Sequence, residues 1–189
     1  MSAYDTSDLK KGLKILIDGV PYVVLEAQFV KPGKGAAFIR TKMKNLLYGG
    51  NIERNIRSNE KIEPADVEDR PMTYLFKEGD DFVVMDQTNY EQTPISKEVM
   101  GDNWKWLKDN MVVQVTFYNG RPLDVQLPNF VDLKITQSDP GARGDTSGNV
   151  LKPATLETGA VIGVPLFVNE GETIKIDTRE GAYVERVKV

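Results

Sequence analysis

Residues Glu26–Asn45 read EAQFVKPGKGAAFIRTKMKN, two alternating runs joined by a segment of lysine, proline and glycine. Alternation of apolar and polar residues is typical of a β-strand with one buried face, because successive side chains of a strand point to opposite sides. The alternation continues after the KPGKG segment from Phe38 to Lys44, and before it the apolar positions are Leu25, Ala27 and Phe29. The stretch therefore predicts a β-hairpin with Lys34 at its tip.

The same kind of pattern recurs along the rest of the chain. Two dipeptides, Asp18-Gly19 and Asn119-Gly120, separate apolar runs and are typical of the two-residue turns of hairpins. Further apolar alternation occurs at Val131, Leu133, Ile135, Ile174 and Ile176. Only one segment, residues 102–110, favours a helix, with Asp102 as its N-cap. The fold class that the sequence predicts is all-β.

Breaks that contain proline divide the 189 residues into three stretches of similar length. They fall near Glu63-Pro64 and Leu127-Pro128, so we predict domains at residues 1–64, 65–128 and 129–189. Many short strands in units this small favour three little barrels in series, of the SH3-like or OB type. A unit of about 60 residues buries only about 60% of its unfolded surface, so we expect neighbouring units to pack together.

Composition excludes several kinds of site. The chain has no cysteine and no histidine, which removes thiolate nucleophiles, disulfides and the commonest general base and metal ligand. Carboxylates, lysines, hydroxyls and tyrosines remain, so composition does not exclude an enzyme, but it favours a binding protein. For such a protein we expect no catalytic residue, no metal site and no bound cofactor. No apolar run reaches the roughly 18 residues of a membrane span, and the polar beginning of the sequence lacks the apolar core of a signal peptide. The expected location is cytoplasmic, without a membrane partner.

Charge is distributed unevenly over a chain whose net charge is −4. Residues 1–65 hold 11 Lys and Arg against 7 Asp and Glu, whereas residues 66–128 hold 6 against 12. Five cations and no acid lie between Glu26 and Glu53. A basic segment on an acidic chain indicates a polyanionic partner that binds in one orientation.

The segment at the hairpin tip is suited to hold one lysine clear of its neighbours. Pro32 and Gly33 fit the central positions of a type II turn, in which the glycine takes a positive φ. Gly35 relieves crowding on the other side of Lys34. The KPGKG sequence contains neither a Walker A pattern nor GxGxxG, so we do not expect a nucleotide cradle here.

The strand that follows predicts a cationic face. Side chains at every second position point the same way, which places Phe38 with Arg40, Lys42 and Lys44. Ile39, Thr41 and Met43 are expected to point into the core. Such a row suits RNA phosphates, each of which adds about 0.7–0.9 to the salt dependence of binding. The alternative is a strand face that is merely solvated.

The connection at Gln137–Asn149 has 13 residues of mostly glycine, serine, aspartate and proline. Loops of about 12–15 residues without secondary structure are uncommon and are often functional or disordered. From composition alone, a functional loop and an insertion without a role remain equally open.

Four stretches resemble the bacterial elongation factor P family. They are FVKPGKGAAFIRTKMKNLLYG (29–49), GDNWKWL (101–107), SDPGARGDTSGN (138–149) and KPATLETGAVIGVPLFVNEGE (152–172). The resemblance implies an SH3-like (KOW-type) first domain followed by two OB-fold domains, with a tRNA-like overall shape. It also implies a translation factor that binds the ribosome beside peptidyl-tRNA and relieves stalling at consecutive prolines.

In this family the loop lysine that matches Lys34 is extended by a β-lysyl group and is sometimes hydroxylated. A ligase similar to lysyl-tRNA synthetase adds the group. The resemblance places Lys34 at the peptidyl-transferase centre, together with its neighbours Lys31, Pro32, Gly33 and Gly35. A second branch carries a rhamnosylated arginine at the position of Pro32, so the proline here favours the lysylated branch. Because the chain has no histidine and no cysteine, the implied action is positioning of the reactants.

The resemblance also assigns other contacts. Arg40, Lys42 and Lys44 are expected to hold the tRNA backbone. Three residues of the third-domain loop match the motif that reads mRNA at the exit-site codon, namely Gly144, Asp145 and Thr146. Tyr183 and Arg186 are further candidates for ribosome contacts, although they would lie on opposite faces of a regular strand. We expect the protein to be a monomer.

Two other functions remain alternatives at this point. One is a general RNA-binding module in which Lys34 is unmodified. The other is a carboxylate-based hydrolase that uses a pair such as Asp80/Asp81 or Asp66/Glu68. These acids lie in turns and linkers, where exposed acidic residues need no catalytic explanation.

Overall fold

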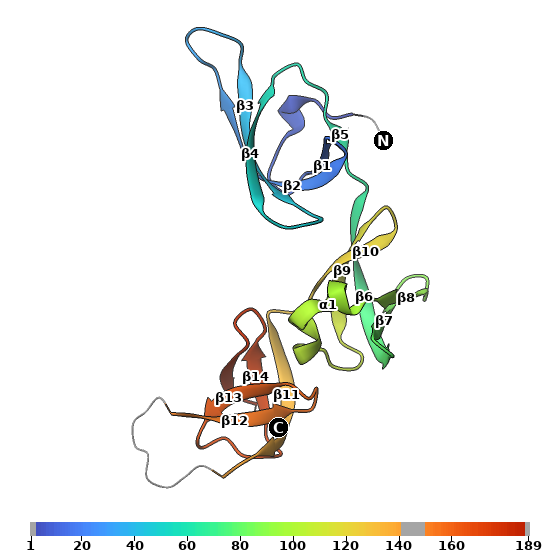
Figure 1. Ribbon diagram of the computed structural model, residues 1–189, viewed down its shortest axis with the longest axis vertical. Coiled ribbons are helices and arrows are strands. Elements are labelled where there is room, and N and C mark those ends of the chain that lie inside the picture. Colours follow the sequence, from blue (N-terminus) through green and yellow to red (C-terminus); the bar gives the residue numbers. More distant parts are fainter. Residues whose placement is uncertain (1–2, 141–149, 188–189) are drawn as a thin grey trace. The chain divides into compact units, whose positions relative to one another are not determined.

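The computed structural model describes residues 3–140 and 150–187, and it is an all-β protein (Figure 1). Three separate five-stranded sheets follow one another along the sequence. The predicted fold class is therefore confirmed. No helix in the described part of the chain is long and apolar enough to cross a membrane.

The first sheet has the strand order β4-β3-β2-β1-β5. Its strands are β1 (Lys14–Ile17), β2 (Val20–Val30), β3 (Phe38–Asn45), β4 (Asn51–Arg57) and β5 (Glu63–Pro64), preceded by the 3-10 turn η1 (Thr6–Asp8). The turn between β1 and β2 is the predicted one, because Asp18 and Gly19 both have positive φ, 53° and 78°, as a type I′ turn requires. The core of this sheet is formed by Leu9, Ile15, Val24, Ile39, Met43, Ile56 and Ile62.

The second sheet has the order β10-β9-β6-β7-β8. Its strands are β6 (Val67–Glu78), β7 (Asp81–Asp86), β8 (Gln92–Ile95), β9 (Val112–Tyr118) and β10 (Arg121–Gln126). The predicted Asn119-Gly120 turn joins β9 and β10, with φ of 49° and 76°. Val113, Val115 and Phe117 of β9 are buried in the predicted alternating pattern.

The helix predicted at residues 102–110 is wrong in its bounds and in its cap. Helix α1 (Lys97–Met100) begins after Ser96, whose side chain accepts a hydrogen bond from the N–H of Val99. The 3-10 helix η2 (Gly101–Trp106) follows it directly. The helical segment ends early because Trp106 and Leu107 turn into the core, and Asn110 has a φ of 64°, which no helix accommodates.

The third sheet has the order β13-β12-β11-β14-β15. Its strands are β11 (Phe130–Ser138), β12 (Leu151–Leu156), β13 (Val161–Pro165), β14 (Thr173–Asp177) and β15 (Ala182–Arg186). The predicted alternation is confirmed, because Leu133, Ile135, Ile174 and Ile176 are fully buried and Val131 is nearly so.

Four strands contain one surplus residue each, which shifts the register against the neighbouring strand. The shifts lie between Val24 and Glu26 in β2, between Tyr74 and Phe76 in β6, between Ile135 and Gln137 in β11, and between Tyr183 and Glu185 in β15. Such a β-bulge moves the following side chains to the other face. Parity counted along the sequence therefore fails beyond each of these points.

The chain forms two compact units. One contains the described residues up to Glu68 together with Thr116–Leu123, and the other contains Asp69–Val115 with the described residues from Asp124 onward. In the second unit, the helical segment that follows β8 packs onto the third sheet, because Trp106 of η2 is buried among the apolar side chains of that sheet. The hydroxyl of Thr158 also donates to the carbonyl of Lys105 at 2.6 Å, so the second and third sheets are joined through η2.

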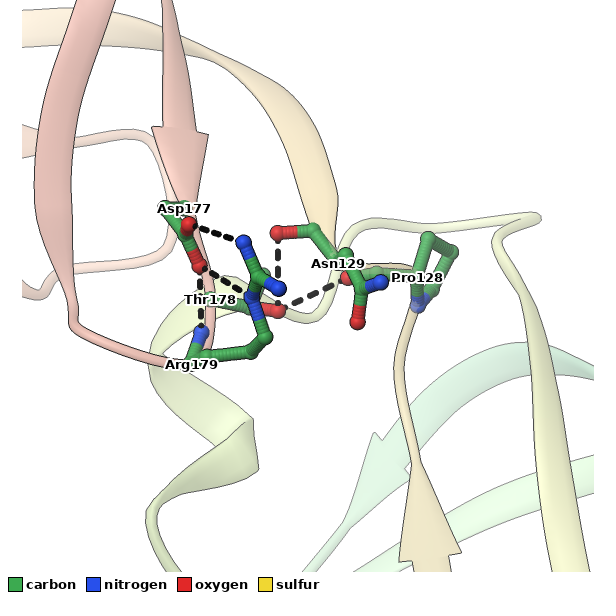
Figure 2. A network of polar contacts seen from close by, with 5 residues as sticks. All are labelled: Pro128, Asn129, Asp177, Thr178 and Arg179. Carbon is green, nitrogen blue, oxygen red and sulfur yellow. Dashed lines mark hydrogen bonds and ion pairs between the residues drawn. The ribbon is translucent and has the colours of Figure 1, made fainter.

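A second junction within this unit lies where β10 leads into β11 (Figure 2). The hydroxyl of Thr178 lies 2.8 Å from the carbonyl oxygen of Pro128 and 3.2 Å from that of Asn129. Beside it, the guanidinium of Arg179 donates to both carboxylate oxygens of Asp177, at 3.0 and 2.6 Å. The turn between β14 and β15 is thereby tied to the start of β11.

Candidate nucleic-acid interface

The KPGKG segment lies at the far end of the β2–β3 hairpin (Figure 1). The two strands remain paired up to Val30 and Phe38, so only residues 31–37 form the loop. Lys34 is exposed, and it makes no hydrogen bond or ion pair to any other residue that the structure describes. The loop therefore carries an unengaged ammonium group at the end of a long, regular hairpin.

The turn geometry in this loop differs from the predicted type II turn. Gly33 does not adopt a positive φ, whereas Gly35 does, at 116°. The conformation that favours glycine thus follows Lys34 instead of preceding it. A Cβ built on Gly35 would lie 3.8 Å from Cγ of Pro32, and one built on Gly33 would meet nothing within 4 Å. Lys34 consequently stands between two residues without side chains, as the sequence indicates.

The predicted alternation along β3 is confirmed. Arg40, Lys42 and Lys44 are exposed, and Phe38 on the same face is half-buried. Ile39, Thr41 and Met43 are buried, with 7%, 0% and 0% of their surface accessible. The three cations therefore share one exposed face of the first sheet.

The cross-strand register makes these three cations unequal. Lys42 is directly opposite Glu26 on β2 and Glu53 on β4. Directly opposed side chains in a sheet have Cβ atoms only about 4.5–5.5 Å apart, so the two carboxylates offset the charge of Lys42. The residues opposite Arg40 and Lys44 are uncharged, namely Gln28 with Asn55 and Val23 with Asn51. The positive potential of this face is thus concentrated at Arg40 and Lys44.

The structure adds one cation that sequence reasoning missed. Arg57 is exposed and lies opposite Phe38, on the cationic face and at the end nearest the loop. Arg57 lies on β4, which was not predicted. The signal for this strand in the sequence is the Gly49-Gly50 pair, which marks the turn before it. In the structure both glycines have positive φ. We call Arg40, Lys44 and Arg57, together with Lys42, the cationic face.

The candidate residues of the third sheet fall into two groups. Gly144, Asp145 and Thr146 lie outside the described residues. Tyr183 and Arg186, however, do not lie on opposite faces, because the β-bulge between Tyr183 and Glu185 pairs them with Ile176 and Ile174, which share a face. Both side chains therefore border one hollow, where Arg186 forms an ion pair with Glu172 at 3.2 Å and its guanidinium carbon lies 5.1 Å from the ring centre of Phe167.

The acidic residues considered for a hydrolase form no enclosed site. Asp80, Asp81, Asp66 and Glu68 are all exposed. Among the described residues, no group of three or more acidic side chains is arranged to hold a metal ion.

Three family models match successive parts of the chain. The elongation factor P KOW-like domain matches residues 5–62, the elongation factor P OB domain matches residues 67–125, and the elongation factor P C-terminal domain matches residues 131–186. Together they cover nearly all of the described residues, in the order and at the places of the three sheets.

Solved structures with a similar fold carry related names. Translation initiation factor 5A from Methanococcus jannaschii is 22% identical, with a TM-score of 0.53 over 67% of this chain and 97% of that one. A translation initiation factor 5A family protein from Naegleria fowleri is 16% identical, with a TM-score of 0.50 over 67% of this chain and all of that one. These likenesses show a shared fold, whereas the three family models identify the chain. It belongs to the elongation factor P family and is a translation elongation factor, not an enzyme.

Proposed function

We propose that this protein binds the ribosome beside peptidyl-tRNA and stimulates peptide-bond formation at consecutive prolines. Lys34, extended by a β-lysyl group, reaches the peptidyl-transferase centre with Lys31, Pro32, Gly33 and Gly35 as its supporting loop. The protein acts as a monomer and uses no dissociable cofactor. The observation that carries the proposal is the exposed Lys34, held between two glycines at the end of a long hairpin without a partner among the described residues.

The hairpin explains how this protein can accelerate a reaction without donating or accepting a proton. Prolyl donors react slowly, and ordering two reactants can lower a barrier by several kcal/mol without any proton transfer. The hydrogen-bonded β2 and β3 support the loop up to Val30 and Phe38, so little chain remains to be ordered on binding. The long cationic arm on Lys34 then orients the end of the peptidyl-tRNA while the ribosome performs the chemistry.

The cationic face binds the phosphates of the tRNA backbone. Phosphate contacts fix register and orientation without reading sequence, which suits a factor that must accept many tRNAs. Arg40 and Lys44, whose opposite residues are uncharged, contribute more to this binding than Lys42. Arg57 extends the face toward the loop.

Two further partners follow from the motifs. Gly144, Asp145 and Thr146 contact mRNA at the exit-site codon, where acceptor and hydroxyl groups can pair with unstacked bases. Tyr183 and Arg186, which share one hollow, provide a ribosome contact near the same end of the chain. Before any of these contacts forms, a ligase similar to lysyl-tRNA synthetase modifies Lys34, and hydroxylation can follow.

The test compares three purified proteins in translation of a reporter with consecutive prolines. Wild type isolated from its native cells should relieve stalling, whereas Lys34→Ala and Lys34→Arg should not, because neither can carry the β-lysyl group. All three should retain the same folded stability, since Lys34 contacts no described residue. Full relief of stalling by Lys34→Ala would refute the proposal.

The mass of the peptide that contains Lys34 distinguishes the proposed function from a general RNA-binding module. The peptide that contains Lys34 should be heavier than its sequence by one lysyl group, with or without one further oxygen. An unmodified peptide from a fully active protein would instead favour the RNA-binding module.

A further inference from the structure

A cavity of about 620 Å³ lies in the second compact unit, remote in sequence from the KPGKG loop and the cationic face. Its walls come from strands β6 and β7, from the helices α1 and η2, from the loop that follows η2, and from the turn after β12. Volumes of about 300–1,000 Å³ are typical of pockets that enclose a small molecule. The proposed function makes no use of this cavity.

Aromatic side chains line one part of the cavity. Tyr74 and Phe82 contribute rings whose centres are 6.3 Å apart and tilted by 48°, and Trp104 contributes a third. Trp104 is only half-buried, whereas Tyr74 and Phe82 are buried. Trp104 is therefore the ring on which a planar group can stack, and the buried rings of Tyr74 and Phe82 form the apolar wall beside it.

Cations gather at the same cavity. Lys77, Lys97 and Lys108 line it, and they are half of the six Lys and Arg of residues 66–128, a segment that holds 12 acidic residues. Lys77 lies opposite Phe82 in the sheet, with its ammonium 5.5 Å from the ring centre. Lys108 pairs with Glu157 at 3.6 Å. Lys77 and Lys97 form no ion pair with another described residue, so the cavity keeps two ammonium groups that suit an anionic ligand.

The remaining lining groups are polar and suited to the edge of a heterocycle. The hydroxyl of Tyr74 makes no hydrogen bond to another described residue, and burial together with the charge of Asp109 raises the pKa of this phenol, so the hydroxyl keeps its proton. The carboxylates of Asp109 and Glu157 also face the cavity. A neutral donor and two acceptors can bind exocyclic amino groups or ribose hydroxyls.

We propose that this cavity binds a nucleotide, with the base stacked on Trp104 beside Tyr74 and Phe82 and the phosphate held by Lys77 and Lys97. The same chemistry is presented by a free mononucleotide and by an unpaired nucleotide of an RNA strand. The inference does not depend on the modification of Lys34 or on ribosome binding.

Binding is measured on the full chain without ribosomes, by tryptophan fluorescence and by calorimetry. Trp106 is buried in the core, so stacking in the cavity should quench Trp104 alone, and Trp104→Phe should remove the optical signal. The probes are AMP, adenosine, inorganic phosphate and a short single-stranded RNA. AMP should bind more tightly than adenosine or phosphate, because only AMP engages both the rings and the ammonium groups.

Two lysine variants and one matched control test the site. Lys77→Gln and Lys97→Gln should each weaken AMP binding by about threefold, the size expected of an exposed charge pair, and should leave adenosine binding unchanged. The control is Lys105→Gln, which removes a lysine from η2 that pairs with Asp102 at 3.2 Å and does not line the cavity. It should bind AMP like wild type. Lys34→Ala should also bind normally, which separates this site from the proposed function.

The RNA probe identifies the source of the nucleotide. Tighter binding of RNA than of AMP, with the same dependence on Lys77 and Lys97, would assign the cavity to an RNA nucleotide, and the reverse order to a free mononucleotide. The proposal is overturned if neither probe gives a saturable response at millimolar concentration, or if the lysine variants bind as wild type does. It is also overturned if a short oligoglutamate displaces AMP equally well, because the site would then accept any anion.

Discussion

Arg40 and Lys42 are two positions apart on β3 and point to the same side, but their electrostatic surroundings differ. Lys42 lies between Glu26 and Glu53, whereas Arg40 lies between Gln28 and Asn55. A cation that is already offset by neighbouring carboxylates releases fewer counterions when a phosphate approaches. The two residues should therefore contribute unequally to RNA binding.

This difference can be measured from the salt dependence of ribosome binding. Arg40→Ala should lower the magnitude of the slope of log K against log salt by about 0.7–0.9, the value for one phosphate contact. Lys42→Ala should lower it by clearly less. Arg54→Ala serves as the control, since Arg54 lies on the same sheet but pairs with Asp18 at 3.0 Å. Equal changes for Arg40→Ala and Lys42→Ala would show that the glutamates do not offset Lys42.

At this scale, the sequence predicts which side chains are exposed but not what lies opposite them. The exposure of Arg40 and the burial of Thr41 follow from the alternation of a strand, which is a local property. Glu26 beside Lys42 could not be predicted, because the register of β2 depends on the bulge between Val24 and Glu26. Glu53 could not be predicted either, because it lies on β4, which the sequence did not reveal as a strand. Parity also failed for Tyr183 and Arg186, for the same physical reason.

The turn between β14 and β15 contains an ion pair between Asp177 and Arg179, which lies near the start of β11. Hydrogen bonds from the Arg179 side chain, assisted by the backbone N–H groups of Arg179 and Glu180, hold the pKa of the Asp177 carboxyl below its ordinary value. Asp177 itself is buried, while the side chain of Arg179 is 59% accessible. A carboxyl whose pKa is lowered by folding stabilises the folded state wherever it is ionised.

The pH dependence of stability follows from the sign of this shift. The stabilisation should be complete above the ordinary carboxyl pKa of about 3.9, and it should be lost as the pH falls through the lower pKa of the folded state. Arg179→Ala should reduce this acid-dependent loss and should destabilise the protein at neutral pH. Both tryptophans belong to the second unit, so denaturant unfolding followed by fluorescence between neutral pH and pH of about 3 measures the effect.

Arg121→Ala is the matched control for this experiment. Arg121 is exposed and forms no ion pair with another described residue, so its removal should leave the acid dependence of the wild type. The same acid dependence in Arg179→Ala and wild type would contradict the role assigned to the Asp177–Arg179 pair.

Strands and turns could be predicted where the backbone of a turn requires particular residues. Asp18-Gly19 and Asn119-Gly120 take the positive φ values that a two-residue hairpin turn requires, so both hairpins were predicted from four residues. The helix at 102–110 was wrong because tertiary packing of Trp106 outweighed the local propensity of a short polar segment. The strand β4 was not predicted, since its alternation is weak and four of its residues are polar and exposed.

Trp106 is the largest side chain that joins the helical segment to the third sheet. It extends from η2 and is buried among apolar residues of that sheet, with 7% of its surface accessible. The same ring explains why residue 181 is a glycine, because an added Cβ would lie 3.0 Å from Cζ2 of Trp106 and the φ there is 65°. Trp104, Met111 and Leu127 are partly buried against the same core, and polar contacts such as that of Thr178 with Pro128 add to them.

Removal of the Trp106 ring should therefore weaken the whole unit and uncouple its sheets. Trp106→Ala should lower the free energy of unfolding by about 3–5 kcal/mol, as for other buried tryptophans, and calorimetry should resolve two transitions where the wild-type unit gives one. Trp104→Ala is the control, because Trp104 is only partly buried against the same core. Its effect should be smaller and should leave one transition. A single transition in Trp106→Ala would show that the remaining contacts suffice to couple the sheets.

For the whole molecule, family membership was more predictable than assembly. The motif around Lys34 and the segment from Lys152 to Glu172 resemble the elongation factor P family, and three family models confirm that family. The packing of η2 onto the core of the third sheet was not predictable, since it depends on where Trp106 points. Local sequence patterns contain no such information.

The strands that contain β-bulges should tolerate substitutions better than insertions or deletions. A substitution inside β2, β6, β11 or β15 alters one side chain, whereas insertion or deletion of a residue at a regularly paired position would exchange inward and outward positions along the remainder of that strand. In β15, insertion of one further residue between Tyr183 and Arg186 would place these two side chains on opposite faces and dismantle the hollow they share. Related sequences should consequently diverge at these strands by replacement of residues, while gaps and insertions accumulate in the connecting turns.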